Sequence, residues 1–207
     1  MTQVKICGLR ESASFDAAIE AGADYVGLVF YPKSPRFVDV AQAARLAGRA
    51  RGGAKLVGLF VAPERDDVTA VLRSVKLDIL QIYGPASAVA TVRGCFEGLV
   101  WRQLGVSSAV DFPADDEDTD GFVVEAKPPT GATRPGGNGV LADWDLLADF
   151  KPVRPWLLAG GLNPDNVAAA LARVNAPGVD VSSGVEIAPG QKSPDLISQF
   201  IKAVRQT

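Results

Sequence analysis

The stretch Val4-Lys5-Ile6-Cys7-Gly8-Leu9-Arg10 decides how the rest of the chain is interpreted. Apolar and long-stemmed side chains run into a cysteine and then a glycine, a pattern typical of a short buried strand that ends in a tight turn. Such a strand presents the Cys7 thiol at its C-terminal tip. A lone cysteine is more often a small buried hydrophobe than a reactive group. The role of Cys7 therefore depends on what else gathers at this tip.

The same unit of strand, loop and amphipathic helix recurs along the chain. Tyr25–Phe30 is a continuous apolar run, as expected of a parallel strand covered on both faces. We expect further strands at 55–61, 78–82, 98–103, 121–126, 156–161 and 178–184, and helices at 12–21, 40–50, 65–74, 85–93, from about 143, 163–174 and 194–204. Asn163 and Pro164 are interpreted as the cap and first residue of their helix. The connection 105–118 is polar and acidic and contains Pro113, so helix 5 is expected to be short or missing.

Eight such units favour a closed barrel. They average about 26 residues each, near the lower size limit of a (β/α)₈ TIM barrel, and we expect residues 1–207 to form one such domain. An open doubly wound sheet is the alternative. No Gly-x-Gly-x-x-Gly follows the first strand, and eight regular repeats favour closure.

Composition excludes several classes of function. A net charge of −3 supplies no basic surface for nucleic acid, and no apolar run approaches the ~18–20 residues of a membrane span. The N-terminus enters the first strand at once, without a signal peptide, and the two distant cysteines fit a reduced, cytoplasmic setting. We expect a monomer rather than a homodimer. The chain has no histidine, which removes the Ser-His-Asp arrangement and nearly all zinc chemistry, so we expect no metal site.

The catalytic site of such a barrel lies at the C-terminal ends of the strands. Polar residues at these ends include Cys7, Arg36, Gln81, Tyr83, Glu125 and Asp180. Two glycine-containing turns, Ala159-Gly160-Gly161 and Ser182-Ser183-Gly184, follow strands seven and eight. They would expose backbone N–H groups, helped by a helix beginning near Val185-Glu186, and so predict a phosphate site. Gly137, within the glycine cluster 136–139, is expected in a flap that covers the phosphate.

Five motifs together resemble the phosphoribosylanthranilate isomerase family of tryptophan biosynthesis. They are Lys5-Ile-Cys-Gly-Leu9, Phe30-Tyr-Pro-Lys-Ser-Pro-Arg36, Pro135-Gly-Gly-Asn-Gly139 before Asp143-Trp144, Leu158-Ala-Gly-Gly-Leu-Asn-Pro164, and Gly178-Val-Asp-Val-Ser-Ser-Gly-Val-Glu186. Each motif alone is weak, but five in this order are specific, and the likeness spans essentially the whole chain.

The resemblance implies an Amadori rearrangement of a small phosphorylated substrate, N-(5-phosphoribosyl)anthranilate. It implies that Cys7 is the general base, that Arg36 binds the anthranilate carboxylate and that Asp180 contacts the sugar. Gln81 is expected to bind substrate, and the glycine turns to hold its phosphate. No cofactor is required, because the imine formed from the substrate accepts the electrons. Lys5 shares a strand face with Cys7 and is a candidate for adjusting the pKa of the thiol.

The chain departs from the family pattern at two positions. Glu125 stands where the family has its aspartate acid, and Tyr83 stands where a histidine is usual. We assign Glu125 as the general acid and expect Tyr83 to pack or to hydrogen-bond. The extra methylene of Glu125 moves the carboxyl by about 1 Å, a shift that can cost ~10²-fold in rate. Two alternatives remain open at this point: a related sugar-phosphate isomerase of histidine biosynthesis, disfavoured by Cys7, and a barrel that binds phosphorylated ligands without catalysis.

Overall fold

The structure is a computed structural model, and it describes residues 1–50, 53–113, 118–127 and 143–207. Eight parallel strands close into a barrel in the order β1 to β8, with β8 pairing back to β1. The strands are β1 (Gln3–Cys7), β2 (Tyr25–Val29), β3 (Lys55–Val61), β4 (Ile79–Tyr83), β5 (Leu99–Val106), β6 (Gly121–Ala126), β7 (Trp156–Leu158) and β8 (Gly178–Val181). The predicted (β/α)₈ barrel is confirmed.

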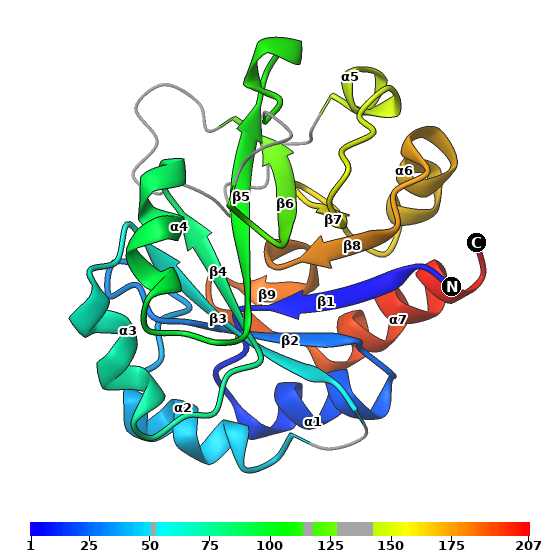
Figure 1. The fold of residues 1–207 in the computed structure, drawn as a ribbon. Coiled ribbons are helices and arrows are strands. Elements are labelled where there is room, and N and C mark those ends of the chain that lie inside the picture. Colours follow the sequence, from blue (N-terminus) through cyan, green and yellow to red (C-terminus); the bar gives the residue numbers. More distant parts are fainter. Residues whose placement is uncertain (51–52, 114–117, 128–142) are drawn as a thin grey trace.

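Helices surround the barrel on its outside (Figure 1). They are α1 (Ser12–Glu20), α2 (Val40–Ala47), α3 (Arg65–Leu72), α4 (Ala86–Arg93), α5 (Trp144–Ala148), α6 (Val167–Val174) and α7 (Pro194–Arg205). Their ends follow local chemistry: Asp39 accepts a hydrogen bond from the N–H of Gln42 at the start of α2, and Ser193 caps α7 ahead of Pro194. The described part of the β5–β6 connection holds only the 3₁₀ turn η1 (Ala109–Asp111). The expectation of a short or missing helix after the fifth strand is therefore confirmed for these residues.

The same hydrogen bond from a backbone N–H to an aspartate side chain is repeated at the N-terminal end of the barrel. Asp24, Asp78 and Asp120 each immediately precede an even-numbered strand. Each carboxylate accepts the N–H of a residue on the preceding odd-numbered strand, at 2.7–2.8 Å. These bonds satisfy backbone donors where the strands begin, and so fix the register of neighbouring strands. Above them lies an apolar layer of inward side chains: Tyr25, Val57, Ile79, Trp101, Val123, Leu157 and Ala159.

Two details of the last units were predicted wrongly. Asn163 caps a turn as predicted, because its side chain accepts from the N–H groups of Asp165 and Asn166, but Pro164 is not the first helical residue: α6 begins three residues later, at Val167. After β8 the expected helix near Val185 is absent. A 3₁₀ turn, η2 (Ser183–Val185), leads instead into a small hairpin of β9 (Glu186–Ala188) and β10 (Gln191–Lys192).

Candidate active site

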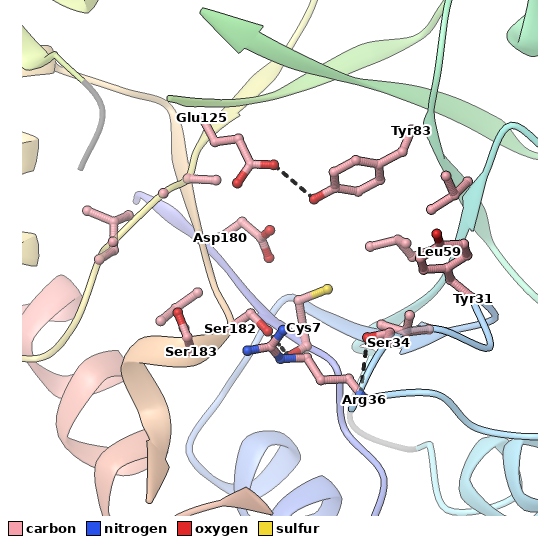
Figure 2. Close-up of a pocket in the computed structure, with 17 residues that line it drawn as sticks. Cys7, Tyr31, Ser34, Arg36, Leu59, Tyr83, Glu125, Asp180, Ser182 and Ser183 are labelled. Atoms are coloured by element: carbon pink, nitrogen blue, oxygen red, sulfur yellow. Dashed lines mark hydrogen bonds between the residues drawn. The ribbon is translucent and has the colours of Figure 1, made fainter. Parts of the chain in front are cut away.

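A pocket opens at the C-terminal ends of the strands, as the fold requires. Cys7 from β1, Glu125 from β6 and Asp180 from β8 line it, together with Arg36 from the loop after β2 and Tyr83 from β4. Figure 2 shows the Cys7 sulfur directed into the centre of this pocket, between the carboxyl groups and the Arg36 side chain. Five positions far apart in the chain therefore meet in one cavity.

The Cys7 thiol occupies space left by a glycine on the neighbouring strand. A Cβ atom at Gly27 would lie 3.0 Å from the Cys7 sulfur and 3.1 Å from its Cα, so a larger residue there would displace the thiol. Below it, the buried Lys5 ammonium donates to Asp180 Oδ1 at 2.8 Å. Burial lowers the pKa of Lys5, but the charge and hydrogen bond of Asp180, joined by Cys7 once its thiol ionises, outweigh burial and raise that pKa above its ordinary value.

Burial and neighbouring charges together favour the protonated form of the Cys7 thiol. Burial raises the pKa of Cys7, the Lys5 ammonium lowers it, Asp180 raises it and Lys192 lowers it, with a net rise above the ordinary value. Lys5 is thus the chief group favouring the thiolate, as its shared strand face predicted. At neutral pH the thiolate form of Cys7 is therefore a minority species.

The Glu125 carboxyl is held by two neighbours. Tyr83 Oη donates to Glu125 Oε1 at 3.1 Å, and Gln103 Nε2 donates to the same oxygen at 3.0 Å. All three side chains are buried. Burial and then the charge of Glu125 raise the pKa of Tyr83 well above its ordinary value, so its phenol keeps its proton. The hydrogen-bonding role expected of Tyr83 is confirmed.

Arg36 is fixed from below by the β9–β10 hairpin. Its guanidinium donates through Nε and Nη2 to the two carboxylate oxygens of Glu186, at 2.7 and 2.9 Å. The buried Lys192 ammonium also binds Glu186, at 2.8 Å, and donates to the backbone oxygen of Ser182 at 2.8 Å. Burial lowers the pKa of Lys192 to about 8 against the attraction of Glu186. This network ties the loop that carries Arg36 to the turn after β8.

The predicted phosphate turns lie side by side at the pocket wall. Gly160, Gly161, Ser182 and Ser183 line it. Gly160 and Gly161 have φ of +88° and +64°, a backbone that favours glycine. Asn166 Nδ2 donates to the Gly161 oxygen at 3.0 Å and holds the first turn. Gly184 is needed for close packing, because a Cβ there would lie 1.8 Å from the Leu162 oxygen. Gly137 and its cluster lie outside the described residues.

Comparison with known proteins assigns the family. The model of the N-(5'phosphoribosyl)anthranilate (PRA) isomerase family matches residues 4–203. The N-(5'-phosphoribosyl)anthranilate isomerase of Acidiphilium cryptum is 51% identical over 203 residues, which are 98% of this chain and 98% of that one. The chain belongs to this family. It is therefore an isomerase of tryptophan biosynthesis, as the five motifs predicted.

Two solved structures are similar to this chain in fold as well as in sequence. Monomers of the dimeric phosphoribosylanthranilate isomerase from Thermotoga maritima share 33% of their residues with this chain, over the full length of both, at a TM-score of 0.80. A phosphoribosylanthranilate isomerase in complex with reduced 1-(o-carboxyphenylamino)-1-deoxyribulose 5-phosphate shares 31%, again over both full lengths, at a TM-score of 0.81. The barrel seen here is the barrel of the isomerase family.

One predicted site residue lies apart from the pocket. Gln81, in the middle of β4, is fully buried beneath the pocket and does not line it. Neither its Oε1 nor its Nε2 has a hydrogen-bond partner among the residues that the structure describes. A direct contact between Gln81 and a substrate stays a prediction.

Sequence reasoning missed three residues that shape the site: Gln103, Glu186 and Lys192. Gln103 was detectable, because it follows Trp101 at the inward spacing of two along β5. Glu186 and Lys192 were not, because their roles depend on a hairpin at the place where a helix was expected.

Membrane-spanning and metal-binding features are both missing from the described ranges. None of the helices in these ranges combines the length and apolar character that crossing a membrane needs. The same ranges contain no group of three or more histidine, cysteine, aspartate or glutamate side chains placed to hold a metal ion.

Proposed function

We propose that this pocket catalyses the Amadori rearrangement of N-(5-phosphoribosyl)anthranilate to 1-(2-carboxyphenylamino)-1-deoxyribulose 5-phosphate, with Cys7 as general base and Glu125 as general acid. The observation that carries these roles is that the thiol and the carboxyl come from β1 and β6 and face one cavity. One solved relative is a complex with reduced 1-(o-carboxyphenylamino)-1-deoxyribulose 5-phosphate, which supports the same ligand chemistry here.

The chemistry needs one proton donor and one proton acceptor. Glu125 gives its proton to the furanose ring oxygen, the bond from C1′ to that oxygen breaks, and the nitrogen lone pair forms the protonated Schiff base. The Cys7 thiolate then removes the proton from C2′, and its electron pair moves toward the imine to give the enolamine. Loss of the enol proton and protonation of C1′ give the ketone. One proton enters for each that leaves, as an isomerisation requires.

Substrate orientation falls to the charged residues around this pair. Arg36 uses Nε and Nη2 on Glu186, and its guanidinium has further N–H donors for the anthranilate carboxylate. Asp180 contacts the sugar hydroxyls from β8. The turns at Gly160-Gly161 and Ser182-Ser183-Gly184 hold the phosphate through backbone N–H groups. The phosphate thus binds at one wall while the reacting carbons lie near Cys7.

The decisive experiment follows the fluorescence of the anthranilate group. Addition of the protein should abolish the fluorescence of N-(5-phosphoribosyl)anthranilate with saturable kinetics. Cys7→Ser should remove nearly all turnover while the protein still binds the reduced product. Cys95→Ser is the matched control, because the Cys95 sulfur contacts the Val92 oxygen after α4, away from the pocket. Fluorescence that persists with the wild-type protein, although the reduced product binds, would contradict the proposed catalysis.

We also propose that residues 1–207 act as a single-domain monomer in a reducing, cytoplasmic setting. The exposed large apolar side chains of the described residues are spread over separate elements: Met1, Leu99, Val110, Val153 and Ile187. They form no shared element face of the kind that stable dimers bury. Cys7 and Cys95 are both free thiols. Light scattering during gel filtration tests this: one species of about 22 kDa is expected, and a species of twice that mass would contradict it.

A further inference from the structure

Among the residues that the structure describes, Glu125 is the only carboxyl group of the pocket in which one oxygen accepts hydrogen bonds from two neutral donors. Tyr83 reaches it from β4 and Gln103 from β5, the strand that pairs with β6 in the register Gln103↔Val123. Figure 2 shows the Tyr83 ring extending across the pocket with its hydroxyl directed at the Glu125 carboxyl. Both donors therefore act on the orientation of one carboxyl group.

We infer that Tyr83 and Gln103 are positioning residues that hold the Glu125 acid at its working place, and that this arrangement requires glutamate rather than aspartate at position 125. The inference deepens the proposed function and rests on it. Neither residue needs to touch the substrate for this role. Each acts through Glu125 Oε1.

Geometry explains why the length of the side chain matters. The Gln103 bond, at 3.0 Å, has the usual length of an N–H···O bond, and the Tyr83 bond, at 3.1 Å, is slightly longer than an ordinary O–H···O bond. Removing one methylene withdraws the carboxyl toward β6 by about the length of a C–C bond, ~1.5 Å. An aspartate oxygen would then lie beyond hydrogen-bonding reach of both donors. A carboxyl without these contacts has more rotational freedom and a less favourable orientation toward the ring oxygen.

The donors are well suited to a fixed role. The raised pKa of Tyr83 keeps the phenol protonated, and the Gln103 amide does not titrate. All three side chains are largely buried, each at most 9% exposed, which limits the access of water to Oε1. In a site of low dielectric a hydrogen bond to a carboxyl is stronger than in water. The pair thus holds the acid in the same place throughout the neutral range.

Tyr83→Phe is the central test, because it removes one hydroxyl and keeps the ring. We expect kcat to fall by about 10-fold to 100-fold, the range for a displaced catalytic group, while KM changes by less than about twofold because substrate-binding groups stay in place. Tyr25→Phe is the matched control: Tyr25 is also buried, but it is the first residue of β2, at the opposite end of the strand from the pocket, and does not line it. Its loss of a hydroxyl should leave kcat unchanged. Gln103→Met should resemble Tyr83→Phe, with a smaller fall in kcat.

A double-mutant cycle separates positioning from a direct role. Glu125→Asp should lower kcat at unchanged KM, and adding Tyr83→Phe to it should cost no more than about twofold further, because the contact is already lost. If Tyr83→Phe lowers kcat as much in the Glu125→Asp background as in the wild type, Tyr83 acts on the substrate itself, and the inference is overturned. Wild-type kcat in Tyr83→Phe, or raised kcat in Glu125→Asp, would overturn it as well. These outcomes leave the proposed function intact, whereas a wild-type protein without turnover overturns both.

Discussion

The buried pair of Lys5 and Asp180 gives the sharpest stability prediction. Lys5 is fully buried, and its ammonium lies 2.8 Å from Asp180 Oδ1, whose side chain is 9% exposed. Lys5→Met keeps most of the apolar stem but leaves the carboxylate without its cation. Breaking a buried ion pair on one side costs about 3–5 kcal/mol. Because Asp180 lines the pocket and water can approach it, we expect the lower end, about 3 kcal/mol.

Thermal and urea unfolding at pH 7 measure this loss. For a chain of this size each 1 kcal/mol shifts Tm by about 2–4 °C, so Lys5→Met should lower Tm by about 6–12 °C. Lys76→Met is the control, because that lysine is exposed, and it should change stability by less than about 0.5 kcal/mol. Adding Asp180→Asn to Lys5→Met should restore at least about 1 kcal/mol, since the unpaired charge is then gone.

The pH dependence of the wild type follows from the raised pKa of Lys5. A lysine whose pKa is higher in the folded state contributes stability below its unfolded pKa, about 10.4, and loses it as pH rises through the higher folded value. The difference in stability between wild type and Lys5→Met should therefore be full at pH 7 and shrink above about pH 10. A change in Tm below 2 °C at pH 7, or a difference that grows with alkaline pH, would refute the argument.

Three further predictions concern the pocket. In a Cys95→Ser background, the rate of Cys7 alkylation by iodoacetamide should keep rising beyond pH 9, because burial raises the pKa of the thiol; a plateau below pH 8 would contradict this. Gly184→Ala should lower the free energy of unfolding by about 3 kcal/mol in urea titration, because its Cβ meets backbone, whereas Gly48→Ala, with ordinary contacts at 3.6 Å, should be near neutral. Gln81→Met should raise that free energy by about 1 kcal/mol by removing a buried amide that has no partner among the described residues; a tenfold rise in KM would support the predicted contact of Gln81 with substrate, and an unchanged KM would contradict it.

The barrel could be predicted because its signals are local. Each strand is covered on both faces and so is a short apolar run, and each run was recognised within a few residues of its observed bounds. The pocket residues followed from topology alone: once the strands are parallel and closed, their C-terminal ends meet. Cys7, Glu125 and Asp180 could thus be placed together without knowing any contact between them.

The contacts within the site could not be predicted, because they join residues distant in the chain. The pairing of Arg36 with Glu186 spans 150 positions, and it depends on the β9–β10 hairpin, where glycine turns after β8 suggested a helix instead. Gly190 illustrates the difficulty: a Cβ there would lie 2.3 Å from the Pro35 oxygen, so this glycine lets the hairpin pack on the loop of Arg36. Nothing near Gly190 in the sequence indicates that partner.

The ion pairs of Arg36 with Glu186 and of Lys5 with Asp180 affect how readily Cys7 forms a thiolate when substrate binds. A pocket that binds a phosphate and a carboxylate gains negative charge, and negative charge near Cys7 opposes formation of its thiolate. The buried cations Lys5 and Lys192 lower the pKa of Cys7, whereas Asp180 raises it. The groups that bind the substrate anions are expected on the loops and on Arg36, so neither lysine has to bind a substrate anion. Lys5 can therefore keep its interaction with the thiol when substrate enters, and the proposed proton abstraction by Cys7 would depend on a cation that the substrate does not neutralise.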